Sequence, residues 1–206
     1  MDETIVIAAT KNRHKVEEIS ALMQSFGMNV VGRDEAGVPD FEVEESGSSF
    51  EENALLKAEA IYEFSGRAVI ADDSGLMVDA LDGAPGIYSA RFAEPSTSMT
   101  QDEANNEKLL ALLADVPDDE RTARFVSAIA MIIPGRQEPI IVRGECPGRI
   151  IRKPDGEGGF GYDPLFVADI NSGSGRSFAR ISQAEKNAVS HRAQALAKLA
   201  NLLAEE

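Results

Sequence analysis

Cysteine is nearly absent from this 206-residue chain, and its scarcity excludes two kinds of architecture. The single residue, Cys146, can form no disulfide within the chain and cannot by itself build a cysteine-based metal cluster. We therefore expect a protein of a reducing compartment, with a cytoplasmic location. Cys146 is expected to be a small buried or half-buried side chain that takes no part in catalysis.

Long apolar runs are also missing. No stretch approaches the roughly 20 apolar residues that a membrane helix requires, and the first ten residues, "MDETIVIAAT", lack the basic and then apolar order of a signal peptide. With 43% hydrophobic residues, the chain is still long enough to bury a substantial core. We expect one domain over residues 1–206 and no membrane partner.

Positive charge is in short supply. The chain has 20 Lys and Arg against 35 Asp and Glu, which gives a net charge of −15. Such a surface repels nucleic-acid polymers, whose binding depends on neutralising phosphates, so we expect no polymer partner. A small anion is not excluded, because cations gather in "TKNRHK", residues 10–15, and in "EKNAVSHR", residues 185–192. Both histidines of the chain fall in these two stretches.

The apolar pattern along the chain predicts one mixed-sheet α/β domain with two lobes. Short apolar or β-branched runs predict strands at residues 4–10, 28–32, 67–71, 122–133, 138–146 and 148–152. Helical spacing predicts helices at about 16–26, 49–66, 100–113 and from 182 onward, the last one broken near Ser190. Ser49 with Glu52, and Thr100 with Glu103, match the capping box at two helix starts.

The segment "TKNRHK" places polar and basic residues at a junction between a strand and a helix. Free backbone N–H groups and the positive end of the helix dipole allow such a junction to bind phosphate. Thr10 and Asn12 can donate side-chain hydrogen bonds, while Lys11, Arg13 and Lys15 supply positive charge. The segment lacks the glycines of a P-loop, so an ordinary capped helix with solvated basic residues remains an alternative.

Three acidic residues are candidates for a metal site. Glu45 lies in a loop before a helix, and Asp72 and Asp73 follow the run "RAVIA" where we expect a strand to end. Oxygen ligands with few histidines suit Mg²⁺ or Mn²⁺, and a divalent cation makes two neighbouring carboxylates favourable. The alternative is a turn in which these charges are exposed.

Two further stretches could contact a nucleotide. The loop "GEGGFGYDPLF" is rich in glycine, which lets the backbone approach a ligand, and Phe160 and Tyr162 offer faces on which a base can stack. The stretch "SHR" supplies His191 and Arg192 at a helix start, near Lys186. A purely structural hairpin and a solvated helix start remain the alternatives.

Together these stretches resemble the inosine triphosphate pyrophosphatase family. The family's T-x-N-x-x-K is present as Thr10, Asn12 and Lys15, and "FEENALLKA" matches its F-x-E-N-A-x-x-K-A helix. The segment "DDSGLMVDALDGAPGIYSARF" matches a further family motif without a gap, and "GGFGYDPLF" and "SHRAQAL" follow in the family's order. The resemblance covers nearly the whole chain.

The resemblance implies an enzyme that hydrolyses deaminated purine nucleoside triphosphates, namely ITP, dITP and XTP, to the monophosphate and pyrophosphate. It implies Mg²⁺ as the metal, with Mn²⁺ as an alternative, and a homodimer. The implied fold is a long mixed central β-sheet with flanking helices, forming two lobes around a nucleotide-binding cleft. Modified pyrimidine triphosphates as substrates, or a nucleotide sensor without turnover, are the alternative functions.

The resemblance also assigns roles to residues. Glu45 and Asp73 serve the metal, Asp73 is in addition the catalytic proton acceptor, and Asp72 supports their geometry. The triphosphate is assigned to Thr10, Lys11, Asn12, Arg13, His14 and Lys15. Other substrate contacts are assigned to Ser74, Phe160, Gly161, Tyr162, Asp163, Lys186, His191 and Arg192. Donors from His191 or Arg192 would pair with the 6-oxo group of the base and disfavour adenine.

Overall fold

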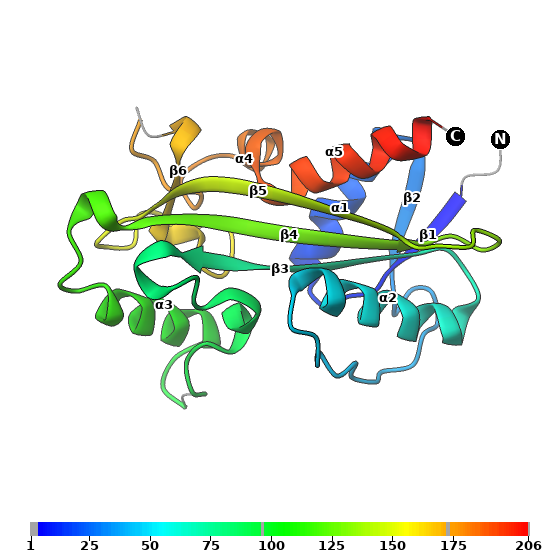
Figure 1. Ribbon diagram of the computed structural model, residues 1–206, viewed down its shortest axis with the longest axis horizontal. Coiled ribbons are helices and arrows are strands. Elements are labelled where there is room, and N and C mark those ends of the chain that lie inside the picture. The colour runs from blue at the N-terminus through cyan, green and yellow to red at the C-terminus, as the bar shows by residue number, and fades with distance from the viewer. Residues whose placement is uncertain (1–3, 96, 172–173, 206) are drawn as a thin grey trace. The chain divides into compact units, whose positions relative to one another are not determined.

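The structure, a computed structural model, describes residues 4–95, 97–171 and 174–205. Six strands form one sheet in the order β2-β1-β3-β4-β5-β6 (Figure 1). Strand β1 pairs in parallel with β2 and with β3, whereas β5 and β6 are antiparallel. The sheet is therefore mixed, which confirms the predicted α/β class. The strands are β1 (Thr4–Ala8), β2 (Met28–Gly32), β3 (Val69–Val78), β4 (Thr122–Ile132), β5 (Ile140–Ile150) and β6 (Phe166–Ala168).

The α-helices of the described residues are α1 (Arg13–Gln24), α2 (Phe50–Ser65), α3 (Gln101–Leu112), α4 (Gln183–Val189) and α5 (His191–Ala204). Short 3-10 helices lie at Asp79–Leu81, Gly86–Arg91, Asp118–Glu120, Asp163–Leu165 and Asp169–Asn171. The predicted break in the last helical segment is confirmed, because Ser190 has an extended backbone between α4 and α5.

The chain divides into two compact units, each with its own hydrophobic core. Unit 1 comprises Met1–Asp73, Ser127–Gly144 and His191–Glu206, and unit 2 comprises Ser74–Val126 and Glu145–Ser190. Strands β3, β4 and β5 each contribute residues to both units. The single domain expected over residues 1–206 stays a prediction.

The core of unit 1 lies between its strands and helices. Val6 and Ala8 of β1 belong to an apolar cluster that includes Ile19 of α1 and Leu196 of α5. Ile7, between them, points to the opposite face of the strand and is equally buried, as expected when both faces of a sheet are covered. Figure 1 accordingly shows α5 and α2 on opposite sides of the strands.

The core of unit 2 is built around three aromatic rings. The ring of Phe125 lies 4.7 Å from that of Phe166 and 6.0 Å from that of Phe178, measured between centroids. Leu109 of α3 closes the same cluster, which also contains Cys146. Burial raises the pKa of the Cys146 thiol to about 12, so it stays an unreactive thiol, and its predicted burial is confirmed.

Two predicted strand boundaries are wrong. Strand β3 does not end before Asp72 and Asp73 but continues through them to Val78, because both carboxylates find partners within the fold. The predicted strands at 138–146 and 148–152 are one strand, β5, which passes through the exposed Pro147. Gly148 lets this strand approach β6, since a Cβ at that position would lie 2.4 Å from the carbonyl oxygen of Val167.

Both predicted helix caps are present. The box of Thr100 and Glu103 is confirmed at the start of α3. At α2, Ser49 is the N-cap and accepts a hydrogen bond from the backbone N–H of Glu52, which confirms the predicted cap. The carboxylate of Glu52 also accepts bonds from the N–H and the hydroxyl of Ser48, which is an additional contact at this helix start.

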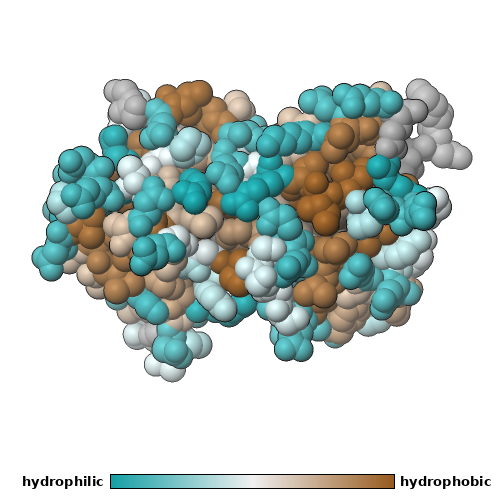
Figure 2. Space-filling model, in the orientation of Figure 1, coloured by the Kyte–Doolittle hydropathy of each residue, from teal (hydrophilic) through white to brown (hydrophobic). Residues whose placement is uncertain are grey.

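None of the helices in the described part of the chain combines the length and apolarity that a membrane crossing demands. Figure 2 shows hydrophilic residues over much of the visible face, with hydrophobic residues between them. This distribution agrees with a chain in which 27% of the residues are charged.

Candidate active site

The adjacent carboxylates Asp72 and Asp73 lie in the interior of β3, and the strand sends them to opposite faces. Asp72 meets side chains from α1 and α5, whereas Asp73 meets side chains from α2. Both side chains are nearly inaccessible to solvent. Strand alternation thus separates two like charges that are neighbours in sequence.

Asp72 is the centre of a buried hydrogen-bond network. Its Oδ1 accepts a bond of 2.6 Å from the hydroxyl of Ser127, and its Oδ2 lies 2.8 Å from Nζ of Lys15. The guanidinium of Arg192 donates to both carboxylate oxygens, at 3.3 and 3.1 Å. The same guanidinium forms an ion pair with Glu18. Two anions and two cations balance in this cluster.

Burial alone would raise the pKa of Asp72, but the charges of Arg192 and Lys15 outweigh it and hold that pKa well below its usual value. Burial likewise disfavours the charged form of Arg192, and Asp72 and Glu18 more than compensate, so its pKa is raised. Asp72 and Arg192 are therefore both charged at neutral pH. Their balance makes Asp72 a structural anion with no free charge to offer a substrate.

Asp73 belongs to a second cluster, which it forms with Lys57 and Glu45. Its Oδ1 lies 2.7 Å from Nζ of Lys57, and Oε1 of Glu45 lies 3.2 Å from the same nitrogen. The amide of Asn53, one helical turn before Lys57, donates to Oδ2 of Asp73 at 3.5 Å. Two carboxylates therefore contact the same ammonium group.

The electrostatics of this second cluster suit proton transfer. Burial raises the pKa of Asp73, and Glu45 raises it further, while Lys57 opposes both effects. The pKa of Lys57 is raised because Asp73 and Glu45 outweigh the burial of its ammonium group. A carboxylate whose pKa is moved toward neutrality is a better proton acceptor at physiological pH than an ordinary aspartate.

The donor set of this cluster fits a divalent metal. Among the described residues, no group of three or more His, Cys, Asp or Glu side chains forms a metal site. Mg²⁺ does not require one, since it is usually held by one or two carboxylates together with water and substrate phosphates. Glu45 and Asp73 supply two carboxylates that already converge on one cation, the ammonium of Lys57.

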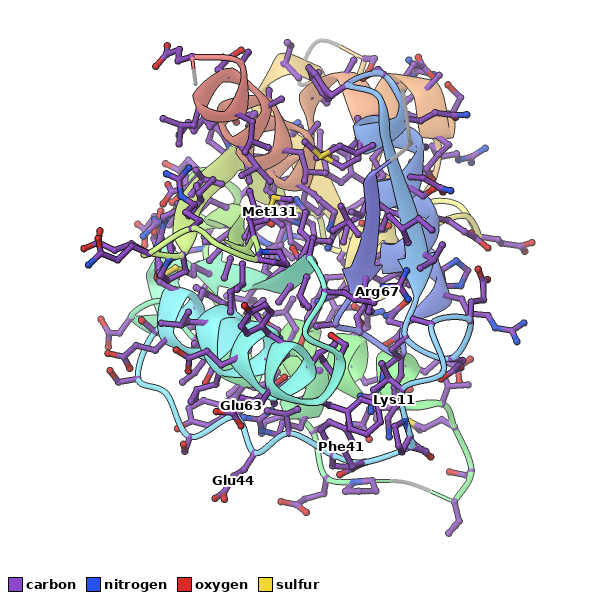
Figure 3. The ribbon with its side chains drawn as sticks, turned by 90° about the vertical axis from the view of Figure 1, so that its right-hand side faces the viewer. Lys11, Phe41, Glu44, Glu63, Arg67 and Met131 are labelled. Atoms are coloured by element: carbon purple, nitrogen blue, oxygen red, sulfur yellow. The ribbon has the colours of Figure 1, made fainter. Side chains whose placement is uncertain are left out.

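The position of Glu45 follows from the extended loop before α2. Exposure alternates along this loop, so that Phe41, Val43 and Glu45 are half-buried while Glu42 and Glu44 are exposed. Figure 3 shows Glu44 pointing away from the rest of the chain. Because exposure alternates along the loop, Glu45 lies on its less exposed side, where it contacts Lys57, whereas Glu42 and Glu44 lie on the exposed side.

Helix α1 begins where the sequence predicts a phosphate-binding junction between a strand and a helix. Asn12 is its N-cap and accepts a bond from the backbone N–H of Lys15 at 3.3 Å, and Thr10 accepts one from the N–H of Asn12 at 3.1 Å. Helices α2, α3 and α4 each have an acidic residue in the first turn, whereas α1 has none and begins with Arg13, His14 and Lys15. The positive end of α1 is thus left available to an anion.

The other basic side chains at this junction are exposed. Lys11 lies 2.5 Å from Asp40, and His14 lies 3.9 Å from Glu17. An exposed ion pair such as that of Lys11 and Asp40 contributes about 0–1 kcal/mol, so it rearranges easily when a ligand arrives. Arg13 is exposed as well.

In unit 2, several predicted substrate residues surround one buried carboxylate. Oδ2 of Asp163 accepts bonds from Nζ of Lys186 at 2.7 Å and from the backbone N–H of Phe160 at 3.0 Å. Lys186 also lies 4.7 Å from the centre of the Phe160 ring, a cation–π distance. Gly159 makes room for this arrangement, since a Cβ there would lie 2.1 Å from Asp163 Oδ2.

The rest of the glycine-rich loop is held by neighbouring elements of unit 2. The hydroxyl of Tyr162 donates to the carbonyl of Ser89 at 2.8 Å, and its ring is part of the core. Burial raises the pKa of this phenol, so it remains protonated. The backbone N–H of Gly161 donates to Oδ2 of Asp102 at 2.7 Å, and its carbonyl oxygen accepts a bond from the side-chain amide of Asn106 at 2.9 Å. Both partners lie on α3.

With this geometry in hand, comparison with known proteins identifies the family. The sequence model described as the Ham1 family matches residues 6–202. The chain belongs to the Ham1 family. A protein of Nocardia farcinica named dITP/XTP pyrophosphatase is 49% identical, with 97% of this chain and 94% of the relative covered. One of Bacillus cereus with the same name is 47% identical, with 94% and 92% covered.

Solved Ham1 structures agree with the fold. The Ham1 protein of Staphylococcus aureus matches with a TM-score of 0.82 and 40% identity, over 98% of this chain and 99% of that one. A structure of a nucleoside-triphosphatase, dITP/XTP pyrophosphatase, from Mycobacterium abscessus matches with a TM-score of 0.72 and 44% identity, over 95% and 98%. These likenesses confirm the resemblance found in the sequence.

For this Ham1 chain, the predicted site residues fall into separate groups. Glu45 and Asp73 meet at Lys57, and Phe160 meets Asp163 and Lys186 within unit 2. Ser74 is half-buried on β3, and its predicted contact with the substrate stays a prediction.

Two predicted substrate residues at the start of α5 are buried. His191 is 5% exposed and Arg192 is 1% exposed. The guanidinium of Arg192 is engaged by Asp72 and Glu18, so the structure gives it a definite role inside unit 1. Contacts of His191 and Arg192 with a base stay predictions.

Four residues of these clusters were missed from the sequence. Lys57 and Asn53 stand one turn apart on α2, within the family motif "FEENALLKA", and this spacing on one helix face was the available signal. Glu18 stands three residues after Lys15 on the same face of α1. Ser127 carried no local signal, because it meets Asp72 from a strand 55 residues away.

Proposed function

We propose that this protein hydrolyses the deaminated purine nucleoside triphosphates ITP, dITP and XTP to the monophosphate and pyrophosphate. The observation that carries the proposal is the pair Asp73 and Glu45 around Lys57, in a chain 47% to 49% identical to relatives named dITP/XTP pyrophosphatase. The reaction would remove deaminated purines from the nucleotide pool.

The chemistry assigns distinct tasks to the residues of unit 1. Water attacks the α-phosphorus, its proton passes to the carboxylate of Asp73, and the bond to the bridging oxygen breaks so that pyrophosphate leaves with the electron pair. The N-terminus of α1, with Thr10 to Lys15, binds the negative phosphate chain. Glu45 and Asp73 would hold Mg²⁺, with Mn²⁺ as an alternative, and the bound metal would neutralise phosphate charge.

Lys57 has a supporting task in this scheme. Its ammonium lies 2.7 Å from Asp73 and opposes the rise in the pKa of that carboxyl. A fully desolvated carboxylate without a cation would be protonated and could not accept a proton from water. Lys57 therefore keeps Asp73 ionised, while burial keeps the pKa of the Asp73 carboxyl raised.

Recognition of the base is assigned to the residues that the family resemblance names for it. Phe160 offers a ring for stacking, and Asp163 and Lys186 supply an acceptor and a donor beside it. Ser74, Gly161, Tyr162, His191 and Arg192 complete the assigned set. A 6-oxo purine would meet hydrogen-bond donors, whereas adenine would present its amino group to them, and unpaired groups of this kind can give discrimination on the order of 10⁴.

The test is a steady-state comparison of purified protein with natural, deaminated and modified pyrimidine nucleoside triphosphates, with and without Mg²⁺. We expect ITP, dITP and XTP to yield the monophosphate and pyrophosphate in a single step that depends on the metal. Release of single phosphates through a diphosphate would contradict the reaction. A preference for a modified pyrimidine triphosphate would show that the substrate is a pyrimidine nucleotide and not a deaminated purine nucleotide. Binding without turnover would show that the protein is a nucleotide sensor.

Further proposals follow from the same family resemblance. We propose a single domain over residues 1–206, a homodimer and a cytoplasmic location. Sedimentation equilibrium at micromolar concentration should give twice the mass of the chain. A mass equal to one chain would contradict the dimer.

A further inference from the structure

Two polar side chains of α3 converge on one glycine of the glycine-rich loop in unit 2. The backbone N–H of Gly161 donates to Oδ2 of Asp102 at 2.7 Å, and the carbonyl oxygen of Gly161 accepts a bond from Nδ2 of Asn106 at 2.9 Å. Asp102 and Asn106 stand about one helical turn apart, so they lie on the same face of α3. The helix therefore holds Gly161 by both of its backbone groups.

Gly161 lies in a segment that depends on contacts of this kind for its conformation. Its φ angle is +61°, in the left-handed region that glycine adopts without strain. Four of the six residues from 156 to 161 are glycines, and glycine loses more conformational entropy on folding than any other residue. Hydrogen bonds from a neighbouring helix restrict the segment to one conformation.

The aromatic residue Phe160 precedes Gly161 and is held by hydrogen bonds on both of its sides. Its N–H donates to Oδ2 of Asp163 at 3.0 Å, and its carbonyl oxygen accepts a bond from the N–H of Asp163 at 3.2 Å. The peptide bond that follows Phe160 carries the N–H that Asp102 binds. Because peptide bonds are planar, these contacts fix the backbone angles of Phe160 and hence the direction in which its ring leaves the chain.

Asn106 makes its contact with Gly161 at a cost. Its Oδ1 is buried and has no hydrogen-bond donor among the described residues. A buried acceptor without a donor destabilises the fold, and an apolar side chain of similar size would avoid that loss. The bond that the amide of Asn106 does form is its donation to Gly161. The position of Gly161, and not the stability of α3, therefore accounts for an amide at this site.

Helix α3 is itself anchored, so it can act as a fixed support for Gly161. Nδ2 of Asn105 donates to the carbonyl oxygen of Ser89 at 3.2 Å. The hydroxyl of Tyr162, the residue after Gly161, donates to the same carbonyl oxygen at 2.8 Å. Hydrogen bonds thus join α3, the 3-10 helix Gly86–Arg91 and the glycine-rich loop into one body.

We propose that Asp102 and Asn106 are positioning residues for base recognition, which by holding Gly161 set the ring of Phe160 for stacking against the base of the bound nucleotide. The ammonium of Lys186, 4.7 Å from the centre of that ring, limits the movement of the ring on one side. The inference rests on the proposed function for the identity of the ligand as a purine nucleotide. A ring held in place loses little further entropy when a base stacks on it, so its support should contribute to affinity.

NMR titration of the intact protein with IMP, the product expected from ITP, tests the inference without turnover. We expect the base protons of IMP to move upfield on binding, because they come to lie over the face of an aromatic ring. Asn106→Leu keeps the approximate size of the side chain and removes the donor, whereas Asp102→Ala removes the acceptor. Each substitution should weaken IMP binding about fivefold, the effect of one net hydrogen bond, and reduce the upfield shift.

Three controls separate positioning of the ring from general damage. Inorganic pyrophosphate has no base, so both variants should bind it with unchanged affinity. Asp102→Asn retains an oxygen that can accept the bond and should stay within about twofold of the unchanged protein. Glu107→Ala changes an exposed residue of the same helix and should leave both affinities unchanged. Equal losses of IMP and pyrophosphate binding, or no loss of either, would overturn the inference.

A double-mutant cycle tests whether the two residues act through Phe160. In a Phe160→Leu background, Asn106→Leu should no longer weaken IMP binding, because the ring that it positions has been removed. An undiminished loss in that background would overturn the inference. If Asn106→Leu does not fold, Asp102→Ala, at an exposed site, takes its place in the cycle.

Failure of this inference can be told apart from failure of the proposed function. Turnover of ITP in a protein whose IMP affinity is independent of Asp102 and Asn106, or whose bound IMP shows no upfield shift, would refute the positioning role and leave the function intact. IMP binding that depends on both residues, in a protein without triphosphate turnover, would refute the function and leave the positioning role intact.

Discussion

Two neighbouring aspartates behave differently in this protein because their partners differ. Burial pushes the pKa of both Asp72 and Asp73 upward. Asp72 faces two cations that reverse the effect, while Asp73 faces one cation that it shares with Glu45. The first residue is consequently a permanent anion, and the second is a candidate proton acceptor.

The task of Asp73 predicts the effect of its removal. Asp73→Asn keeps the shape of the side chain but cannot accept a proton, so kcat for ITP should fall by at least about 10² while the fold survives. Steady-state kinetics and circular dichroism measure the two properties. Asp34→Asn, at an exposed site of the same unit, should change kcat by less than about twofold. Near-normal turnover in Asp73→Asn would remove this residue from the mechanism.

Asp72 is instead predicted to act on stability. Asp72→Asn leaves Lys15 and Arg192 with Glu18 as the remaining anion of the cluster, and breaking a buried ion pair in this way costs about 3–5 kcal/mol. Ser127→Ala removes one hydrogen bond to the same carboxylate and should cost about 1–3 kcal/mol. Chemical denaturation provides the measurement, and equal losses in the two variants would contradict the charge argument.

At the scale of elements, close approach of backbones determines how helices meet strands. Gly144 of β5 lies against the start of α5, and a Cβ there would come within 2.1 Å of the carbonyl oxygen of His191 and 2.5 Å of the N–H nitrogen of Ala195. The obstacle is backbone, which cannot swing aside as a flexible side chain can. A glycine at this point therefore sets the distance between β5 and α5.

Gly144→Ala should accordingly lower the free energy of unfolding by about 1–3 kcal/mol, the range for inserting atoms into a packed interior. Gly32→Ala is the matched control, since a Cβ at Gly32 would meet nothing within 4 Å. The control should change stability little. Thermal denaturation of the two variants side by side decides the matter, and equal melting temperatures would refute the packing argument.

Helix α4 provides a prediction of pH dependence. The carboxylate of Glu185 accepts bonds from the backbone and hydroxyl of Ser182 and pairs with Arg176. These contacts lower its pKa from 4.5 to about 2. Because the pKa is lower in the folded state, the stabilisation is present above pH 4.5 and is lost as the pH falls through about 2.

An NMR titration of the Glu185 carboxyl group should give a midpoint near 2. Ser182→Ala removes the hydroxyl donor but keeps the backbone donor, so the midpoint should move part of the way toward 4.5. An unchanged midpoint in Ser182→Ala would assign the effect to Arg176 and the backbone alone.

At the scale of the whole molecule, the net charge is negative, whereas the local charge at the start of α1 is positive. The chain carries −15 overall, yet Lys11, Arg13 and Lys15 gather at the start of α1. Long-range repulsion acts on a polymer that must lie along the surface, whereas a small anion feels mainly the charges within about one Debye length. We therefore predict that the molecule binds small phosphates and does not bind nucleic-acid polymers.

Fluorescence anisotropy can check this separation. Labelled single-stranded and duplex DNA should show no binding at about 0.15 M salt and micromolar protein, whereas pyrophosphate should bind under the same conditions. Binding of DNA in this range would contradict the charge argument for the whole molecule.

Local pattern made much of the fold predictable. The strands at the N-terminus, the helix before β3 and the break at Ser190 follow from hydrophobic spacing and from residues that start or end helices. The end of β3 was misplaced because "DDSG" has the composition of a turn. Buried partners for both carboxylates overrode that composition, and they come from distant parts of the chain.

The sequence by itself determined the family, the mixed α/β fold and the identity of most charged residues near the site, because motifs and periodicity are local properties of a chain. Only the tertiary structure decided which charges meet. Arg192 reaches Asp72 across 120 residues, and Lys57 reaches Asp73 across 16. Pairings of this kind depend on how strands and helices pack, and packing is a property of the folded chain as a whole.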